Sequence, residues 1–166
     1  MQNLTAKLIR VVLLSLVAFV LVFVANAQDV KVFSVALTGD SIAPQSIDTP
    51  ATGGAGATLK GSKLRVKGSF SNLTGNLRDY RVDPSEPPNP RITSAVHIHR
   101  GSPKMNGPFQ YALGVDMSAS QRQGTFQGEF DLSSEQLQAL LNGQLYIDIH
   151  TTTFRGGELR GTFVPN

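Results

Sequence analysis

Short runs of alternating apolar and polar residues dominate the chain beyond position 28. The segment 30–37 alternates around an apolar face and ends at the turn residues 38–40, and in 64–70 Leu64, Val66 and Phe70 share one face. Because successive side chains of a strand point to opposite sides of the sheet, these patterns predict β-strands. Further strands are predicted at 58–61, 93–100, 110–115, 124–132, 144–152 and 158–164.

One segment has a helical pattern instead. Ser133 and Gln136 have the spacing of a capping box, a stripe of leucines follows, and Gly143 stands at the expected end. This predicts one short helix near 134–141. The proline- and glycine-containing stretch 43–57 is interpreted as a loop whose residues 53–57 form a flexible turn, and 79–90, with four prolines, as a long exposed loop.

Seven or eight short strands in about 140 residues favour an all-β fold, an antiparallel sandwich or barrel, with the single helix as an exception. The length suits one domain over residues 28–166. Glycines recur within the predicted strands, where they are typical of bulges or of close sheet packing.

Residues 1–27 have the pattern of a secretory signal peptide. Lys7 and Arg10 precede an apolar run at 11–24, and Ala25-Asn26-Ala27 is a small-x-small cleavage sequence. The run is shorter than the roughly 20 residues of a membrane-spanning helix. We therefore expect cleavage, no membrane span in the mature protein, and a secreted or periplasmic location.

Charge and composition exclude several functions. Of the 15 basic residues two lie in 1–27, so 13 basic residues face 12 acidic ones in the rest of the chain. This near-neutral balance gives no electrostatic basis for binding nucleic acid. The sequence contains no cysteine, which excludes disulfides, thiolate metal ligands and a cysteine nucleophile.

The three histidines all lie in predicted strands. His97 and His99 flank Ile98 and so share one face, while His150 shares a face with Asp148. Two imidazoles at i and i+2, completed by a third from a neighbouring strand, can bind one divalent transition metal, zinc or copper. The alternative is that these histidines hydrogen-bond to loop backbone and lock the strand ends.

Asp148 and Glu158 are candidates for a fourth metal ligand or for a carboxylate that orients a ligating imidazole. For Glu158 the alternative is an exposed cross-strand charge pair with Arg160. The sequence contains no Gly-x-Ser-x-Gly, phosphate-loop or His-Glu-x-x-His motif, so no catalytic residue is assigned.

Several motifs, in order, resemble those of the CHRD domain, which is named after chordin. They are 35–39, 64–73, the Ala95–Gly101 stretch with Asn106-Gly107-Pro108, 143–151 and 156–161. The resemblance implies an extracytoplasmic Greek-key β-sandwich, found alone in microbial secreted proteins and in tandem in animal extracellular antagonists. The His-x-His strand is also similar to the copper-binding strand of Cu/Zn superoxide dismutase, but the chain has no second cluster of ligands for a bridged zinc.

We therefore expect an extracytoplasmic metal-binding protein without assigned catalysis. One alternative is a module that binds an extracellular protein or a polysaccharide, with structural histidines; an exposed aromatic patch around 109–111 or Tyr80 would support it. Another is a mononuclear copper enzyme acting on superoxide or peroxide, since three histidine ligands leave one open position. Exposed edge strands could also pair into a homo-oligomer.

Overall fold

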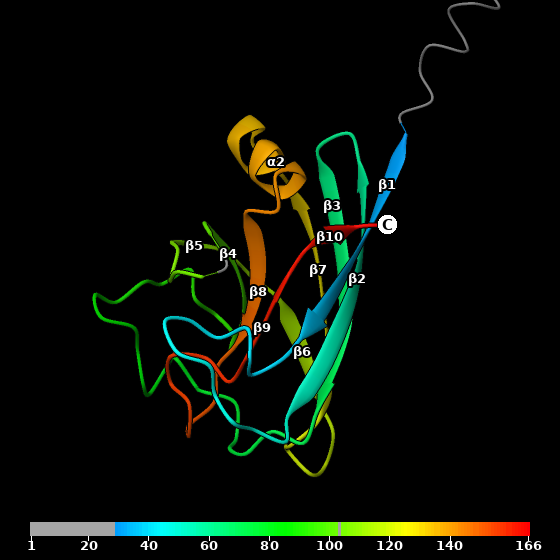
Figure 1. Ribbon diagram of the computed structural model, residues 1–166. Helices are drawn as coiled ribbons and strands as arrows, with labels where there is room; N and C mark the ends of the chain where they lie inside the picture. The colour runs from blue at the N-terminus through cyan, green and yellow to red at the C-terminus, as the bar shows by residue number, and fades with distance from the viewer. Residues whose placement is uncertain (1–28, 103) are drawn as a thin grey trace, which may run out of the picture.

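The computed structural model describes residues 29–102 and 104–166, so the predicted signal peptide at 1–27 lies outside the described residues. Two antiparallel sheets pack face to face, and α2 (Ser134–Leu141) covers one end of the sandwich (Figure 1). The larger sheet has the order β10-β1-β2-β3-β7-β6 and the smaller one β5-β4-β8-β9. The predicted all-β sandwich with one short helix is confirmed.

The strands of the larger sheet are β10 (Val164–Pro165), β1 (Val30–Leu37), β2 (Thr52–Lys60), β3 (Lys63–Ser71), β7 (Gly124–Asp131) and β6 (Gly114–Met117). Those of the smaller sheet are β5 (Phe109–Ala112), β4 (Val96–Arg100), β8 (Leu145–Ile149) and β9 (Leu159–Thr162). Most predicted strands are therefore present, within a few residues of their predicted ends.

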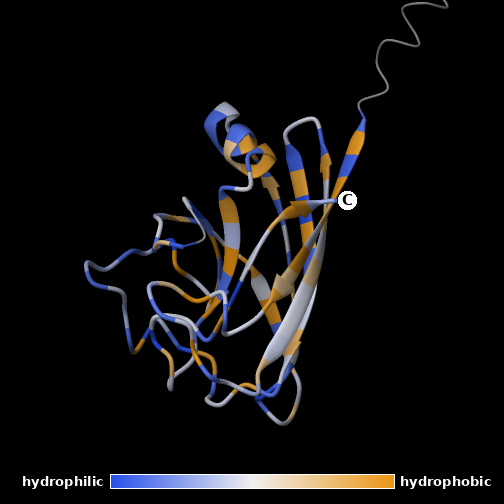
Figure 2. Ribbon diagram, viewed as in Figure 1, coloured by the Kyte–Doolittle hydropathy of each residue, from blue (hydrophilic) through white to orange (hydrophobic). Residues whose placement is uncertain are grey.

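The core lies between the two sheets and is built by period-two alternation. Phe33, Val35 and Leu37 of β1 are buried, and so are the three residues of β3 that were predicted to share a face. Figure 2 shows apolar and polar residues alternating along β1 and β3. The smaller sheet contributes Val96 and Ile98 from β4 and its aliphatic residues from β8. Each such side chain, once fully buried, stabilises the fold by about 1.5–3 kcal/mol.

The chain passes from one sheet to the other at two buried residues. The predicted strand 110–115 is two strands, β5 in the smaller sheet and β6 in the larger, and the amide of Leu113 between them donates to the Val96 carbonyl at 2.9 Å. The predicted strand 158–164 is likewise divided into β9 and β10 at Phe163. Because alternation continues through such a bend, the hydrophobic pattern does not reveal the change of sheet.

The interpretation of 53–57 as a flexible turn is wrong. These residues belong to β2, which pairs with β1 on one side and β3 on the other. Close packing requires glycine at Gly53, because a Cβ there would lie 2.7 Å from the Ser69 carbonyl oxygen. Local propensity favours a turn for glycine, but pairing with strands on both sides overrides it.

The helix forms as its capping residues predict. Ser133 Oγ accepts a hydrogen bond from the Gln136 amide at 3.2 Å, and Gln136 Oε1 accepts one from the Ser133 amide at 2.9 Å. Ala139 and Leu140 are buried against the sandwich, whereas Leu141 is 40% exposed. Within the described part of the chain, no helix has the length and apolar character needed to cross a membrane.

β9 approaches β1 so closely that the junction tolerates only glycine. Thr38 and Arg160 exchange two backbone hydrogen bonds of 3.0 Å at this point. A Cβ on the next residue, Gly161, would overlap the Ala36 carbonyl oxygen and lie 2.6 Å from Val35 Cγ1. The junction therefore joins the smaller sheet to the edge of the larger one through backbone contact.

We predict that Gly161→Ala destabilises the protein by about 1–3 kcal/mol, because the added methyl group forces β9 away from β1. Gly56→Ala is the matched control: a Cβ there meets nothing within 4 Å, so its effect should stay within about 0.5 kcal/mol. Urea unfolding of both variants measures the difference. Equal stabilities would contradict the proposed close contact.

Candidate metal centre

The candidate site lies on the face of the smaller sheet that points away from the core. Val96 and Ile98 of β4 point into the core, so His97 and His99 point to the opposite side. On the neighbouring strand β8, Asp148 pairs with His97 and Tyr146 with His99. His150 follows the end of β8. Loops cover this face, so His97 is 1% exposed and His150 7% exposed.

The structure brings the three histidines together. Their ring centroids are separated by 4.8 Å (His97–His150), 5.6 Å (His97–His99) and 6.1 Å (His99–His150). One ring nitrogen from each lies within 4.8 Å of the others, and the group formed in this way contains neither Asp148 nor Glu158. Residues more than 50 positions apart in the sequence therefore present three nitrogens to one small space.

A backbone carbonyl holds each of the three rings. His97 Nε2 contacts the Ser94 carbonyl at 2.6 Å, His99 Nδ1 the Gly107 carbonyl at 3.0 Å, and His150 Nδ1 the Arg155 carbonyl at 3.0 Å. Since a carbonyl only accepts hydrogen bonds, each of these ring nitrogens carries the hydrogen. In the neutral rings the lone pairs are consequently on His97 Nδ1, His99 Nε2 and His150 Nε2.

Two of these lone pairs have no partner. His99 Nε2 and His150 Nε2 are buried and accept no hydrogen bond. A buried polar atom without a partner costs about 1–3 kcal/mol, so such atoms are rare in folded proteins and call for an explanation. A metal ion between the rings would satisfy both atoms.

The rings are held in the neutral form that binds metals. Burial, together with the proximity of His150, lowers the pKa of His97 to about 3. Burial also lowers the pKa of His150 to about 4, from an ordinary value of 6.5, and it lowers the pKa of His99. At neutral pH no proton therefore competes for the three lone pairs.

Aromatic side chains surround the three imidazoles. The Tyr80 ring lies 5.1 Å from that of His97, Phe109 lies 5.3 Å from His97, and Tyr146 stacks on His99 at 5.4 Å with an interplanar angle of 9°. Tyr80 and Phe109 are only partly exposed. Tyr80 and Phe109, which would have supported a docking surface, instead enclose the histidines, whereas Tyr111 stacks on Phe130.

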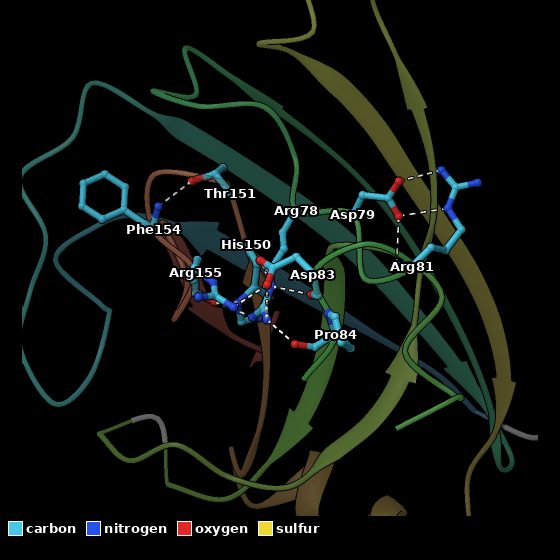
Figure 3. Close-up of polar contacts among 9 residues, drawn as sticks. All are labelled: Arg78, Asp79, Arg81, Asp83, Pro84, His150, Thr151, Phe154 and Arg155. Atoms are coloured by element: carbon cyan, nitrogen blue, oxygen red, sulfur yellow. Dashed lines mark hydrogen bonds and ion pairs between the residues drawn. The ribbon is translucent and has the colours of Figure 1, made fainter. Parts of the chain in front are cut away.

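A network of charged residues attaches the loop that carries Tyr80 to the turn after His150 (Figure 3). Arg78 donates to Asp83 at 2.8 Å and to the Pro84 carbonyl at 2.7 Å, and its guanidinium lies 4.4 Å from the centre of the Tyr80 ring. Arg155 pairs with the same carboxylate of Asp83. The loop 79–90 is thus irregular and largely exposed, as predicted, but Tyr80 and Asp83 anchor it beside the site.

The residues of this network were not among the predicted site residues. Arg78, Asp83 and Arg155 lie in a proline-rich loop and a glycine turn, where charged residues are usually solvated. Their spacing in the sequence does not predict a contact, because Asp83 and Arg155 are 72 positions apart and meet only in the folded protein. The mixture of acidic and basic residues in the proline-rich loop was the one feature of the sequence that indicated such contacts.

The predicted surface pair of Glu158 and Arg160 is wrong. Both residues are buried, at 0% and 1% exposure, and they have different partners. Glu158 accepts hydrogen bonds from Thr49 Oγ1 at 2.7 Å, the Thr74 amide at 2.9 Å and Thr151 Oγ1 at 2.8 Å. Loops cover the outer side of β9, so the polar side of its alternating pattern does not face water.

Asp148 lies beside the imidazoles but is engaged by Arg160. The guanidinium donates two hydrogen bonds of 2.7 Å to the two oxygens of this carboxylate. Its place next to His97 and His99 in the sheet means that its charge acts on both rings, favouring their protonated forms. Its role as a fourth metal ligand remains a prediction.

We predict that the metal-free protein loses stability as the pH falls below about 6.5. Unfolded histidine takes up a proton near this pH, whereas folded His97 and His150 remain neutral down to about pH 3 and 4. Protons therefore bind preferentially to the unfolded chain, and each such histidine lowers the free energy of unfolding by about 1.4 kcal/mol per pH unit. Urea unfolding in EDTA between pH 7.5 and 5 measures this slope, and His97→Gln should reduce it; equal slopes would contradict the burial of a neutral ring.

Comparison with known proteins identifies the family to which this chain belongs. The model of the CHRD domain matches residues 33–163, which is most of the chain and includes all three histidines. No curated protein and no solved structure matches the chain. With the sandwich and the ordered motifs described above, this match shows that the chain belongs to the CHRD domain family.

Proposed function

We propose that this protein is an extracytoplasmic CHRD-domain protein that binds a divalent transition metal, copper or zinc, through His97, His99 and His150. The observation that carries the proposal is the pair of buried nitrogens, His99 Nε2 and His150 Nε2, which have no hydrogen-bond partner. The His97 ring lies beside both. Three imidazole nitrogens without thiolates suit zinc or copper, whereas calcium and magnesium prefer oxygen ligands.

The spacing of the nitrogens supports this assignment. Imidazole nitrogens bind zinc at about 2.0–2.1 Å, so two of them on one ion lie at most about 4 Å apart. The three nitrogens here lie within 4.8 Å of one another. Small rotations of the rings would therefore complete the site, while the carbonyls of Ser94, Gly107 and Arg155 keep the lone pairs directed inward.

The surroundings favour retention of the ion over turnover. Tyr80 and Phe109 lie against His97, and the Arg78–Asp83–Arg155 network holds the loop bearing Tyr80 in place. An enclosed centre exchanges water and small molecules less readily than the open position that a catalytic metal requires. We therefore propose a binding role rather than a catalytic one.

Metal binding is tested by equilibrium dialysis of the EDTA-treated protein against Cu²⁺ and against Zn²⁺. We expect about one ion per chain, loss of at least a hundredfold in affinity in the double variant His97→Ala/His99→Ala, and nitrogen hyperfine splitting in the electron paramagnetic resonance spectrum of the Cu²⁺ form. Phe109→Leu is the matched control, because it alters packing on the same rings without removing a donor atom. Equal metal content in wild type and double variant would end the proposal.

The same preparation distinguishes the other functions considered above. If the histidines are structural, the protein should contain no stoichiometric metal. His97→Ala should then lower the melting temperature and change nothing else. A copper enzyme predicts turnover of superoxide or peroxide by the copper-loaded protein, lost in His150→Ala.

The extracytoplasmic location rests on the charged, apolar and small-residue pattern of 1–27. Expression in a host with a secretory pathway, followed by fractionation and N-terminal sequencing, tests it. We expect the protein outside the cytoplasm, beginning at Gln28. Retention in the cytoplasm with an intact N-terminus would contradict this prediction.

A further inference from the structure

A buried ion pair stands next to the three histidines and takes no direct part in holding them. Asp148 and Arg160 are 2% and 1% exposed, and two hydrogen bonds of 2.7 Å join them side by side. Arg160 also donates to Asn106 Oδ1 at 2.8 Å and to the Met105 carbonyl at 3.2 Å. An ion pair buried this completely contributes little net stability compared with apolar residues of the same volume, so stability alone does not account for its presence here.

The pair is close enough to the imidazoles to act on them electrostatically. His97, Asp148 and Arg160 are directly paired across β4, β8 and β9. Asp148 Oδ2 and His150 Cε1 each lie 3.9 Å from the position that a Cβ on Gly157 would take. The Arg160 guanidinium lies 4.3 Å from the centre of the Tyr146 ring, which stacks on His99.

The charges around the site offer a divalent ion little compensation. The three imidazoles are neutral ligands, and the negative charge of Asp148 is matched by the positive charge of Arg160. Nearby, Arg78 and Arg155 share the single carboxylate of Asp83. Glu158 is also buried, but it is bound by Thr49, Thr74 and Thr151 and does not belong to the histidine group. An ion with two positive charges would therefore keep most of its charge in a buried, largely aromatic environment.

We propose that this centre favours copper in its monovalent state over the divalent state because Arg160 cancels the negative charge of Asp148, the carboxylate beside the imidazoles. The cost of burying an ion grows with the square of its charge, so Cu⁺ is destabilised less than Cu²⁺ where no anionic ligand compensates it. Zinc has no monovalent form and would gain nothing from this environment. The inference rests on the proposed function and narrows the metal to copper.

Changing the net charge of the pair should shift the balance between the two copper states in opposite directions. Arg160→Gln removes the positive charge beside Asp148 and should favour Cu²⁺, while Asp148→Asn removes the negative charge beside Arg160 and should favour Cu⁺ further. A unit charge several ångströms away, in a protein interior of effective dielectric constant about 20, changes such a ratio about tenfold or more. A tenfold change corresponds to about 59 mV in the one-electron reduction potential.

The experiment measures two affinities for each protein. Competition with nitrilotriacetate gives the Cu²⁺ affinity, and competition with bicinchoninate under anaerobic conditions gives the Cu⁺ affinity, with ascorbate supplying the electron that reduces each Cu²⁺ to Cu⁺. No bond of the protein forms or breaks in this step. The ratio of the Cu⁺ affinity to the Cu²⁺ affinity is compared for wild type, Arg160→Gln, Asp148→Asn, the double variant and Arg160→Lys.

We expect the ratio to fall about tenfold or more in Arg160→Gln, to rise by a similar factor in Asp148→Asn, and to stay near that of wild type in the double variant and in Arg160→Lys. If the pair were purely structural, the ratio would change in the same direction in both single variants. This result would overturn the inference. If one single variant fails to fold, the other single variant and the neutral double variant still decide the sign.

The two proposals fail in different ways. Tight copper binding with an unchanged Cu⁺/Cu²⁺ ratio in Arg160→Gln and Asp148→Asn overturns this inference and leaves the three-histidine site intact. A wild-type protein that binds no copper overturns both.

Discussion

The three imidazoles can be buried together because each has a backbone carbonyl that accepts its single ring hydrogen. The carbonyls of Ser94, Gly107 and Arg155 come from three different loops around the smaller sheet. With these hydrogens satisfied, the rings remain neutral, and one nitrogen of each lies within 4.8 Å of the others. The rest of the site depends on this arrangement, since a charged imidazole would repel its neighbours and any metal ion.

The sandwich supports this arrangement by giving the smaller sheet two buried faces. One face packs against the larger sheet through aliphatic residues such as Ile98 and Ile147. The other lies beneath loops held by polar contacts, namely the buried Glu158 with its three donors and the partly exposed Asp83 with its two arginines. Polar residues on the outer face of β4, β8 and β9 therefore form a second interior rather than a surface.

The ion pair of Asp148 and Arg160 determines the net charge beside the histidines in this second interior. The pair is neutral as a whole and occupies the position where a carboxylate could otherwise compensate a metal ion. The Tyr146 ring is in contact with both the guanidinium and His99. Ligands and charges are thus placed by the same three adjacent strands, which links the chemistry of the site to the register of the sheet.

Much of this molecule could be predicted from the sequence because its signals are local. Alternation marked most strands, Ser133 and Gln136 marked the helix, and the i, i+2 spacing put His97 and His99 on one face. Other features depend on contacts between distant segments, which no local pattern records. The change of sheet at Leu113, the pairing of the glycine-rich β2 on both sides, the burial of Glu158 and Arg160, and the loop anchored beside His97 are of this kind. The sequence by itself therefore determined the strands and the donor atoms, whereas the tertiary structure decided which donors meet and how far they are removed from water, because burial is a property of the assembled layers.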